Sequence, residues 1–127
     1  MSDFEVQGLA GWSADLGKAA VQALPAVRAV TEANGTALRD QWRTNARATA
    51  GKHGKWYPSS ITDEGKVTPG AVTVEVGPDS SKRQGGMGRG FEYGSVHQPP
   101  HLDGNKAAEV IAPKFASEIE LAAAGLL

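Results

Sequence analysis

The sequence predicts a small α+β domain: a long helix or helix pair at the N-terminus, a small antiparallel β-sheet with a glycine-rich loop, and a C-terminal alanine-rich helix. Three observations predict this class. Apolar residues recur every three or four positions over residues 9–46 and again over residues 107–126, which is the spacing of one helix face. Between them, residues 71–76 alternate and are β-branched, which is typical of a strand. A chain of 127 residues is short enough for residues 1–127 to form one domain.

The N-terminal helical region contains two apolar stripes on either side of a proline. The stripes are Leu9, Trp12, Leu16, Ala20 and Leu24, and then Val27, Val30, Leu38, Trp42 and Ala46. Helix formation begins near Val6 or at a cap on Ser13. Pro25 either opens a second helix in its first turn or kinks one continuous helix. Gly35 weakens the segment by about 1 kcal/mol relative to alanine, and Gly51 with Gly54 ends it.

The middle of the chain predicts the sheet. Residues 59–63 favour a short strand, residues 63–66 a turn, and residues 71–76 the second strand, which Gly77-Pro78-Asp79 ends. We expect Trp56 and Tyr57, which stand between the helical region and the sheet, to join the two layers.

A polar, glycine-rich loop follows over residues 79–90, and a short strand or turn is expected at Phe91–Tyr93. Its composition favours a flexible segment that becomes ordered on assembly. The glycines match neither the dinucleotide-binding pattern nor a Walker phosphate loop, because the spacing and the following residues are wrong. We therefore interpret the loop as a docking element. Its candidate residues are Lys82, Arg83, Gly85, Gly86, Gly88, Arg89 and Gly90.

The last helix is predicted from Asp103 onward, with Asp103 as its N-cap. Pro99 and Pro100 force extended backbone before it, and Pro113 should kink or divide it. Its apolar stripe is Ala107, Ile111, Phe115, Ile119, Ala122 and Leu126.

The amino-acid composition excludes several classes of function. Leu, Ile, Val and Phe make up only 19% of the chain while the net charge is −1, so we expect a folded domain with a thin core that gains stability from neighbouring subunits. There are no cysteines, which excludes disulfides and thiolate metal sites. No apolar run approaches the ~20 residues of a membrane helix, and Met1–Glu5 does not have the composition of a signal peptide.

The charges are unevenly distributed. Residues 28–55 contain six Lys or Arg against two acidic residues, whereas residues 1–24 and 103–127 are each net negative. Such polarity suits packing against copies of the same chain better than free binding of nucleic acid. Arg39, Arg43 and Arg47 stand four apart and share a helix face. That face is a solvated surface, a subunit contact or a DNA-facing surface, and Lys52 and Lys55 extend it.

No catalytic signature is present. His97, His101 and Asp103, with Glu92 nearby, could be interpreted as metal ligands, but Pro99-Pro100 separates the histidines, so they lack helical spacing. A hydrogen-bonded loop is the better interpretation, and we expect no metal or cofactor. There is no Gly-x-Ser-x-Gly and no cysteine nucleophile. The sequence therefore favours a protein that is not an enzyme.

Several short strings, in this order, resemble the small tail-component proteins of long-tailed siphophages, variously called neck, tail-completion or head-to-tail connector proteins. The strings are Leu24-Pro25-Ala26-Val27, Trp42-Arg43-Thr44-Asn45-Ala46-Arg47, Tyr57-Pro58-Ser59-Ser60-Ile61, Val74-Glu75-Val76-Gly77-Pro78, Phe91-Glu92-Tyr93-Gly94-Ser95 and Pro99-Pro100-His101-Leu102. The similarity runs from about residue 8 to the end. In the last two strings, the resemblance depends on Glu92, Tyr93, Gly94, Pro99 and Pro100.

The resemblance implies a virion structural protein without catalysis, made in the host cytoplasm and located at the head–tail junction. It implies a ring, expected to have six copies, around a channel through which genomic DNA passes without sequence recognition. The neighbours would be the connector or head-closure protein on one side and the tail terminator or tail tube on the other. The alternative from another class is a small nucleic-acid-binding regulator that uses the Arg39, Arg43 and Arg47 face.

Overall fold

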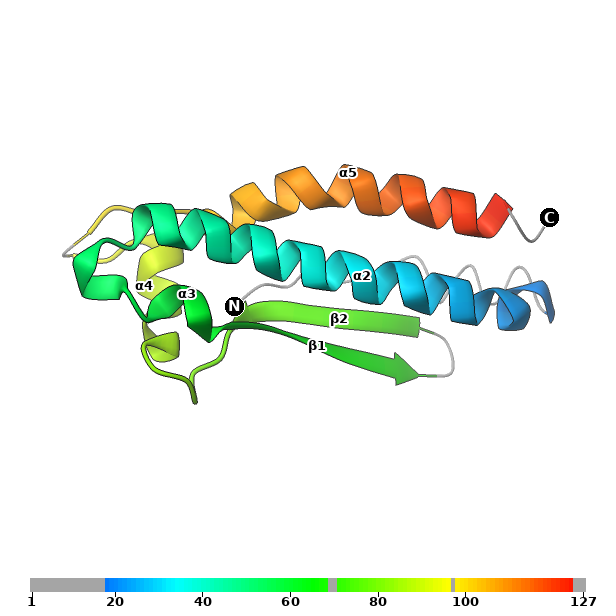
Figure 1. Cartoon of the computed structure of the whole chain (residues 1–127), viewed down its shortest axis with the longest axis horizontal. Helices are drawn as coiled ribbons and strands as arrows, with labels where there is room; N and C mark the ends of the chain where they lie inside the picture. Colours follow the sequence, from blue (N-terminus) through cyan, green and yellow to red (C-terminus); the bar gives the residue numbers. More distant parts are fainter. Residues whose placement is uncertain (1–17, 69–70, 97, 125–127) are drawn as a thin grey trace.

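The protein is built in three layers, with one long helix in the middle (Figure 1). The computed structural model describes the backbone of residues 18–68, 71–96 and 98–124, and the side chains in these ranges from Pro25 onward. Helix α2 (Lys18–Thr49) lies between helix α5 (Asp103–Ala124) and an antiparallel hairpin of strands β1 (Ile61–Thr68) and β2 (Ala71–Pro78). The predicted α+β class is confirmed.

Short helical elements gather at one end of these layers (Figure 1). They are η1 (Lys52–Gly54), α3 (Tyr57–Ser60), η2 (Gly85–Met87) and α4 (Gly88–Tyr93). They enclose the largest aromatic side chains of the core, because Tyr57 stacks on Phe91 with the ring centroids 4.5 Å apart, and Trp42 of α2 is buried in the same cluster. Trp56-Tyr57 does lie where the helical and sheet layers meet, as expected.

Helix α2 continues through Pro25, so the described part of this region is one helix rather than two. The expected helix start near Val6 or Ser13, and most of the first apolar stripe, lie outside the described residues. In the second stripe Val27, Leu38, Trp42 and Ala46 are buried as predicted. The helix ends at Thr49, and Gly51 follows with a φ of 67°.

Gly35 has a packing role that the sequence does not reveal. A Cβ built at Gly35 would collide with the side chain of Val74 on β2. The missing side chain therefore allows the hairpin to approach the middle of α2, which offsets the weak helix propensity of glycine.

The hairpin differs from the prediction at its first strand. Residues 63–66 do not form a turn, because β1 runs from Ile61 to Thr68 and pairs along its whole length with β2. The turn-like string Asp63-Glu64-Gly65-Lys66 is overridden by the ladder to the strongly β-forming partner strand, since strand preference depends on context. Strand β2 was predicted over 71–76 and is confirmed, extending to Pro78.

Helix α5 packs on the side of α2 opposite the hairpin, through Ala107, Ile111 and Phe115. It continues through Pro113, so of the two predicted effects of this proline, a kink or a division, the division is wrong. Pro113 lies on the exposed side, where water can satisfy the backbone carbonyl that has lost its amide partner. Within the described residues, no helix combines the length and the apolar character needed to cross a bilayer.

Candidate functional site

The segment Phe91-Glu92-Tyr93-Gly94 fixes the start of helix α5. Glu92 is only 3% exposed, and its two carboxylate oxygens accept hydrogen bonds from the backbone N–H groups of Gly104 and Asn105, at 2.9 and 3.0 Å. These N–H groups belong to the first turn of α5 and have no partner within the helix. A carboxylate is favoured there both as an acceptor and as a negative charge beside the helix dipole.

The cap of α5 is therefore Glu92, and the prediction that Asp103 caps it is wrong. Asp103 is the first residue of the helix, and its buried Oδ2 accepts a 2.7 Å hydrogen bond from the hydroxyl of Thr49 on α2. The adjoining backbone is also held, because the N–H of His101 donates to the carbonyl of Phe91 and that of Leu102 to the carbonyl of Glu92.

The other residues of this string are placed around the cap. Phe91–Tyr93 is the second half of α4, so the expected strand or turn is wrong there. Tyr93 is 54% exposed and Gly94 ends the helix with a φ of 86°. Pro99 and Pro100 are exposed and lie outside regular secondary structure, in the segment before α5.

Four buried polar atoms close to this cap lack a hydrogen bond of normal geometry. They are Trp42 Nε1, Tyr57 Oη, His101 Nδ1 and Asp103 Oδ1. Burial is the largest cause that raises the pKa of Tyr57; the indole N–H of Trp42 opposes it, and the charges of Glu92 and Asp103 add to it. Tyr57 is accordingly a neutral phenol within the core rather than a nucleophile.

The structure does not assemble the candidate metal ligands. Both oxygens of Glu92 are occupied by backbone N–H groups, and His101 Nδ1 lies 3.9 Å from Asp103 Oδ2. His97 lies outside the described residues. Among residues 18–68, 71–96 and 98–124, no group of three histidines or carboxylates is placed to hold a metal ion.

The end of the molecule that carries the short helices brings together two sets of predicted site residues. They are Lys52 with Lys55, and the docking-loop candidates of residues 82–90. Gln84 joins them: its Oε1 accepts the N–H of Trp56 at 2.8 Å, and its Nε2 donates to the carbonyl of His53 at 2.9 Å. Two cations lie over the indole ring of Trp56, Arg83 at 4.3 Å and Lys55 at 5.1 Å from the ring centroid. Cations over an indole face are attracted by its quadrupole.

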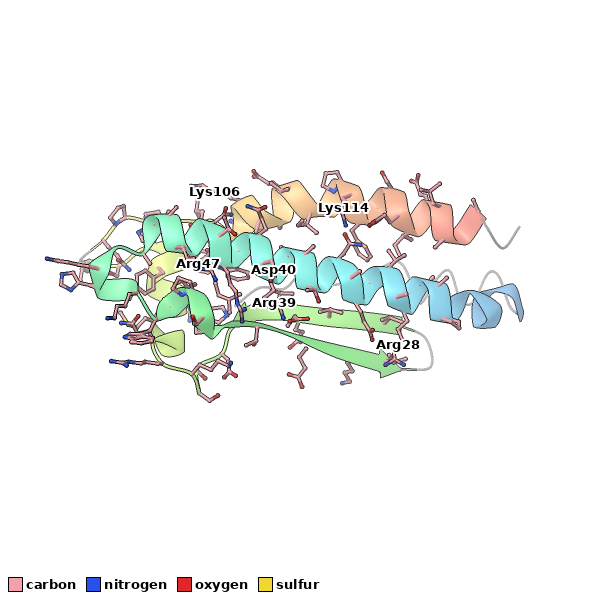
Figure 2. All side chains as sticks on the ribbon, viewed as in Figure 1. Arg28, Arg39, Asp40, Arg47, Lys106 and Lys114 are labelled. Carbon is pink, nitrogen blue, oxygen red and sulfur yellow. The ribbon has the colours of Figure 1, made fainter. Side chains whose placement is uncertain are left out.

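We call this region the basic end and define it by residues 47–57 and 79–101. Its six basic side chains are Arg47, Lys52, Lys55, Lys82, Arg83 and Arg89, against Asp79 and the buried Glu92. The described side chains elsewhere include six Lys or Arg and nine Asp or Glu. The molecule is thus an electrostatic dipole, and the labelled Arg47 lies toward its basic end (Figure 2).

The glycine-rich segment of the basic end is folded rather than extended. Residues 85–93 form η2 and α4, and glycines allow close packing there: a Cβ at Gly85 would strike the backbone of Asp79, and one at Gly88 the ring of Pro78. Residues 85–90 of the predicted loop over 79–90 are therefore helical, which corrects the expected loop conformation there. Gly86 faces open space, Gly90 lies near Gln98, and Arg89 and Tyr93 border an open hollow of about 580 Å³.

The arginine face of α2 is divided between two roles. Arg39 Nη1 donates to Asp63 on β1 at 2.8 Å, and Arg43 Nε donates to the carbonyl of Ile61 at 2.8 Å. A hydrogen bond to Asp40 is the largest cause that raises the pKa of Arg39, so its charge is permanent. Arg39 and Arg43 therefore hold the hairpin to α2, whereas Arg47 is exposed at the basic end.

Comparison of the chain with protein-family profiles, with curated proteins and with solved structures finds no significant match.

Proposed function

We propose that this protein is a structural component of a bacteriophage virion, located at the head–tail junction, where copies of it form a ring around the DNA channel. The proposal starts from the resemblance to siphophage tail-component proteins in the ordered strings between residues 24 and 102. In this proposal the protein performs no catalysis and binds no cofactor. Its neighbours are the connector or head-closure protein and the tail terminator or tail tube.

The observation that carries the proposal is the separation of charge between the basic end and the rest of the molecule. Copies in a cyclic ring meet head to tail, so each subunit must present two different surfaces. A chain with net charge −1 that carries an excess of cations at one end and an excess of carboxylates elsewhere has two such surfaces. Complementary potentials give register and specificity to such contacts.

The strings that carry the resemblance also have structural roles. Phe91-Glu92-Tyr93-Gly94 forms α4 and the cap of α5, and Tyr57-Pro58-Ser59-Ser60 forms α3. Both lie at the basic end, where they hold α2, the hairpin and α5 in one arrangement. A wall built of long helices with one rigid end suits a mechanical role.

The direct test is the protein content of finished particles. Virions produced from the genome that encodes this chain should contain it in a fixed ratio to the other junction proteins, as measured by quantitative mass spectrometry. A stop codon early in its gene should yield filled heads and free tails in electron micrographs. Particles that lack the chain and are still joined and infectious would refute the proposal.

A regulator that binds nucleic acid is the second candidate, and the exposed Trp56 among the cations of the basic end favours it. Arg39 and Arg43 contact β1, so a nucleic acid would have to use the basic end rather than the α2 face. This candidate predicts affinity of the isolated chain for DNA that falls steeply with salt. The virion proposal predicts weak affinity, because one copy contacts few phosphates.

A further inference from the structure

The face of the hairpin that is turned away from α2 carries an unbalanced charge. Strand register places Glu64 directly opposite Glu75. Asp63 and Val76, their neighbours, face α2, so alternation places both glutamates on the outer face, where both are exposed. Like charges directly opposite each other on one face destabilise a strand pair.

Within the described residues, no cation forms an ion pair with either glutamate. Lys66 lies on the same face opposite Thr73, but the described residues show no ion pair for Glu64, Glu75 or Lys66. A shallow hollow of about 280 Å³ lies beside the glutamates and reaches Asp79 at the base of the hairpin. Hydrogen bonds from the hydroxyl and backbone N–H of Ser81, and then the charge of Lys82, lower the pKa of Asp79, so a carboxylate at the edge of the basic end also borders the hollow.

The basic end has the complementary charge and a rigid group to present. Trp56 is 39% exposed, with Lys55 and Arg83 over its ring, and Gln84 holds the backbone at His53 and at Trp56. Tryptophan and arginine are the side chains that most often dominate the energy of protein interfaces. Because Gln84 already orders the loop, docking would require little loss of conformational entropy.

We infer that the outer hairpin face is the docking surface for the basic end of a second copy, with Lys55, Trp56 and Arg83 of one copy placed against Glu64 and Glu75 of the next. A nucleic acid would suit the basic end alone, since its phosphates would be repelled by the glutamates. A second copy accounts for both surfaces. The contact joins two different surfaces, so it propagates into a ring or a filament. The inference rests on the self-assembly in the proposed function.

Charge reversal gives the decisive experiment. We expect Glu64→Lys with Glu75→Lys, or Lys55→Glu with Arg83→Glu, to weaken self-association by about tenfold or more in sedimentation velocity at low salt. All four substitutions in one chain should restore it, and so should mixing the two double variants, because each reversed surface then meets a reversed partner. Lys106→Glu with Glu109→Lys, on exposed positions of α5, is the matched control and should associate like the wild type. Circular dichroism should show all variants folded.

The absence of cysteines allows a second measurement that detects weak contacts. Chains with Thr73→Cys on the outer face and chains with Lys82→Cys at the basic end should form mixed disulfide dimers when oxidised together, whereas Glu109→Cys should not react with either. A wild-type chain that stays monomeric and forms no such cross-link, a four-fold variant that does not recover, or DNA binding without self-association would each overturn the inference.

The outcome is separable from that of the proposed function. If self-association responds to the charge reversals as expected but the chain is absent from virions, the inferred interface is supported and the proposed virion role is refuted. If the chain is present in virions but its self-association is unchanged by the charge reversals, the virion role is supported and the inferred interface is refuted.

Discussion

The two ends of this molecule are held together by different kinds of interaction. At the basic end, α2, α3, α4 and the start of α5 enclose large side chains, with Trp42, Tyr57 and Phe91 in one buried cluster. Toward the other end, the buried residues of α2 are Val27, Thr31 and Asn34. Hydrogen bonds there replace the packing of large apolar side chains. The largest buried side chains of this sparse core therefore lie next to the end that carries the excess of cations.

The far end is joined by a small network rather than by aromatic packing. Asn34 donates through Nδ2 to Glu118 at 2.9 Å, and Lys114 Nζ donates to Asn34 Oδ1 at 3.0 Å and to Glu118 at 3.1 Å. Lys114 accordingly lies between α5 and α2 in Figure 2. Mutations at the two ends should therefore differ in magnitude and in their dependence on pH.

The largest loss is expected from Trp42→Ala, which removes the largest buried side chain at the basic end. We expect the free energy of unfolding to fall by about 3–5 kcal/mol in urea titrations followed by circular dichroism. Val27→Ala, equally buried at the far end, should cost only about 2 kcal/mol, because it removes two methyl groups. Equal losses at the two positions would contradict the difference between the ends.

Gly35→Ala tests the close contact between α2 and the hairpin. The new methyl group would overlap Val74, so we expect a loss of about 1–3 kcal/mol despite the better helix propensity of alanine. Val74→Ala in the same chain should recover part of this loss, as measured in a double-mutant cycle. Gly86→Ala, which faces open space, is the control and should change stability by less than about 1 kcal/mol. A stabilising Gly35→Ala would show that the hairpin is not held at this point.

Glu92→Gln tests the cap of α5. It keeps the size of the side chain but removes the charge and replaces one acceptor with a donor that faces an N–H group. We expect a loss of about 1–2 kcal/mol in thermal or urea unfolding. Asp103→Asn, at the position that the sequence favoured as the cap, should cost less than Glu92→Gln, since an amide oxygen can still accept from Thr49. The exposed Glu109→Gln should be near neutral, and a larger effect of Asp103→Asn would reverse our assignment.

The same contrast explains what the sequence could predict. The two long helices and β2 have strong local signals: apolar periodicity over residues 27–46 and 107–115, and β-branched alternation over 71–76. The missed features depend on residues distant in the sequence. Strand β1 is imposed by its partner, and the Glu92 cap joins residues twelve and thirteen positions apart. No local pattern encodes such pairs.

The candidate site shows the same limit. Sequence analysis identified the basic residues as candidates but placed them in two separate groups. Lys52 and Lys55 belonged to one group, and Lys82, Arg83 and Arg89 to the other. What unites them is Gln84, an uncharged residue whose two hydrogen bonds reach across about thirty positions of sequence. The arginine face of α2, by contrast, was a valid pattern whose first two members contact β1.

The smallest expected effect belongs to the far end and depends on pH. The hydrogen bond from Asn34, followed by that from Lys114, lowers the pKa of Glu118 below its ordinary value of 4.5. A carboxyl whose pKa is lower in the folded state stabilises folding above its unfolded pKa, and this contribution disappears as the pH falls through the folded pKa. Glu118→Gln should therefore lower the urea midpoint slightly at neutral pH, and the difference from wild type should vanish as the pH falls through the folded pKa of Glu118. Because this carboxylate is accessible to water, added salt should also reduce the difference. A difference that persists at low pH would mean that Glu118 acts through packing rather than charge, and would remove the contrast between a far end held by ionised polar links and a basic end held by aromatic burial.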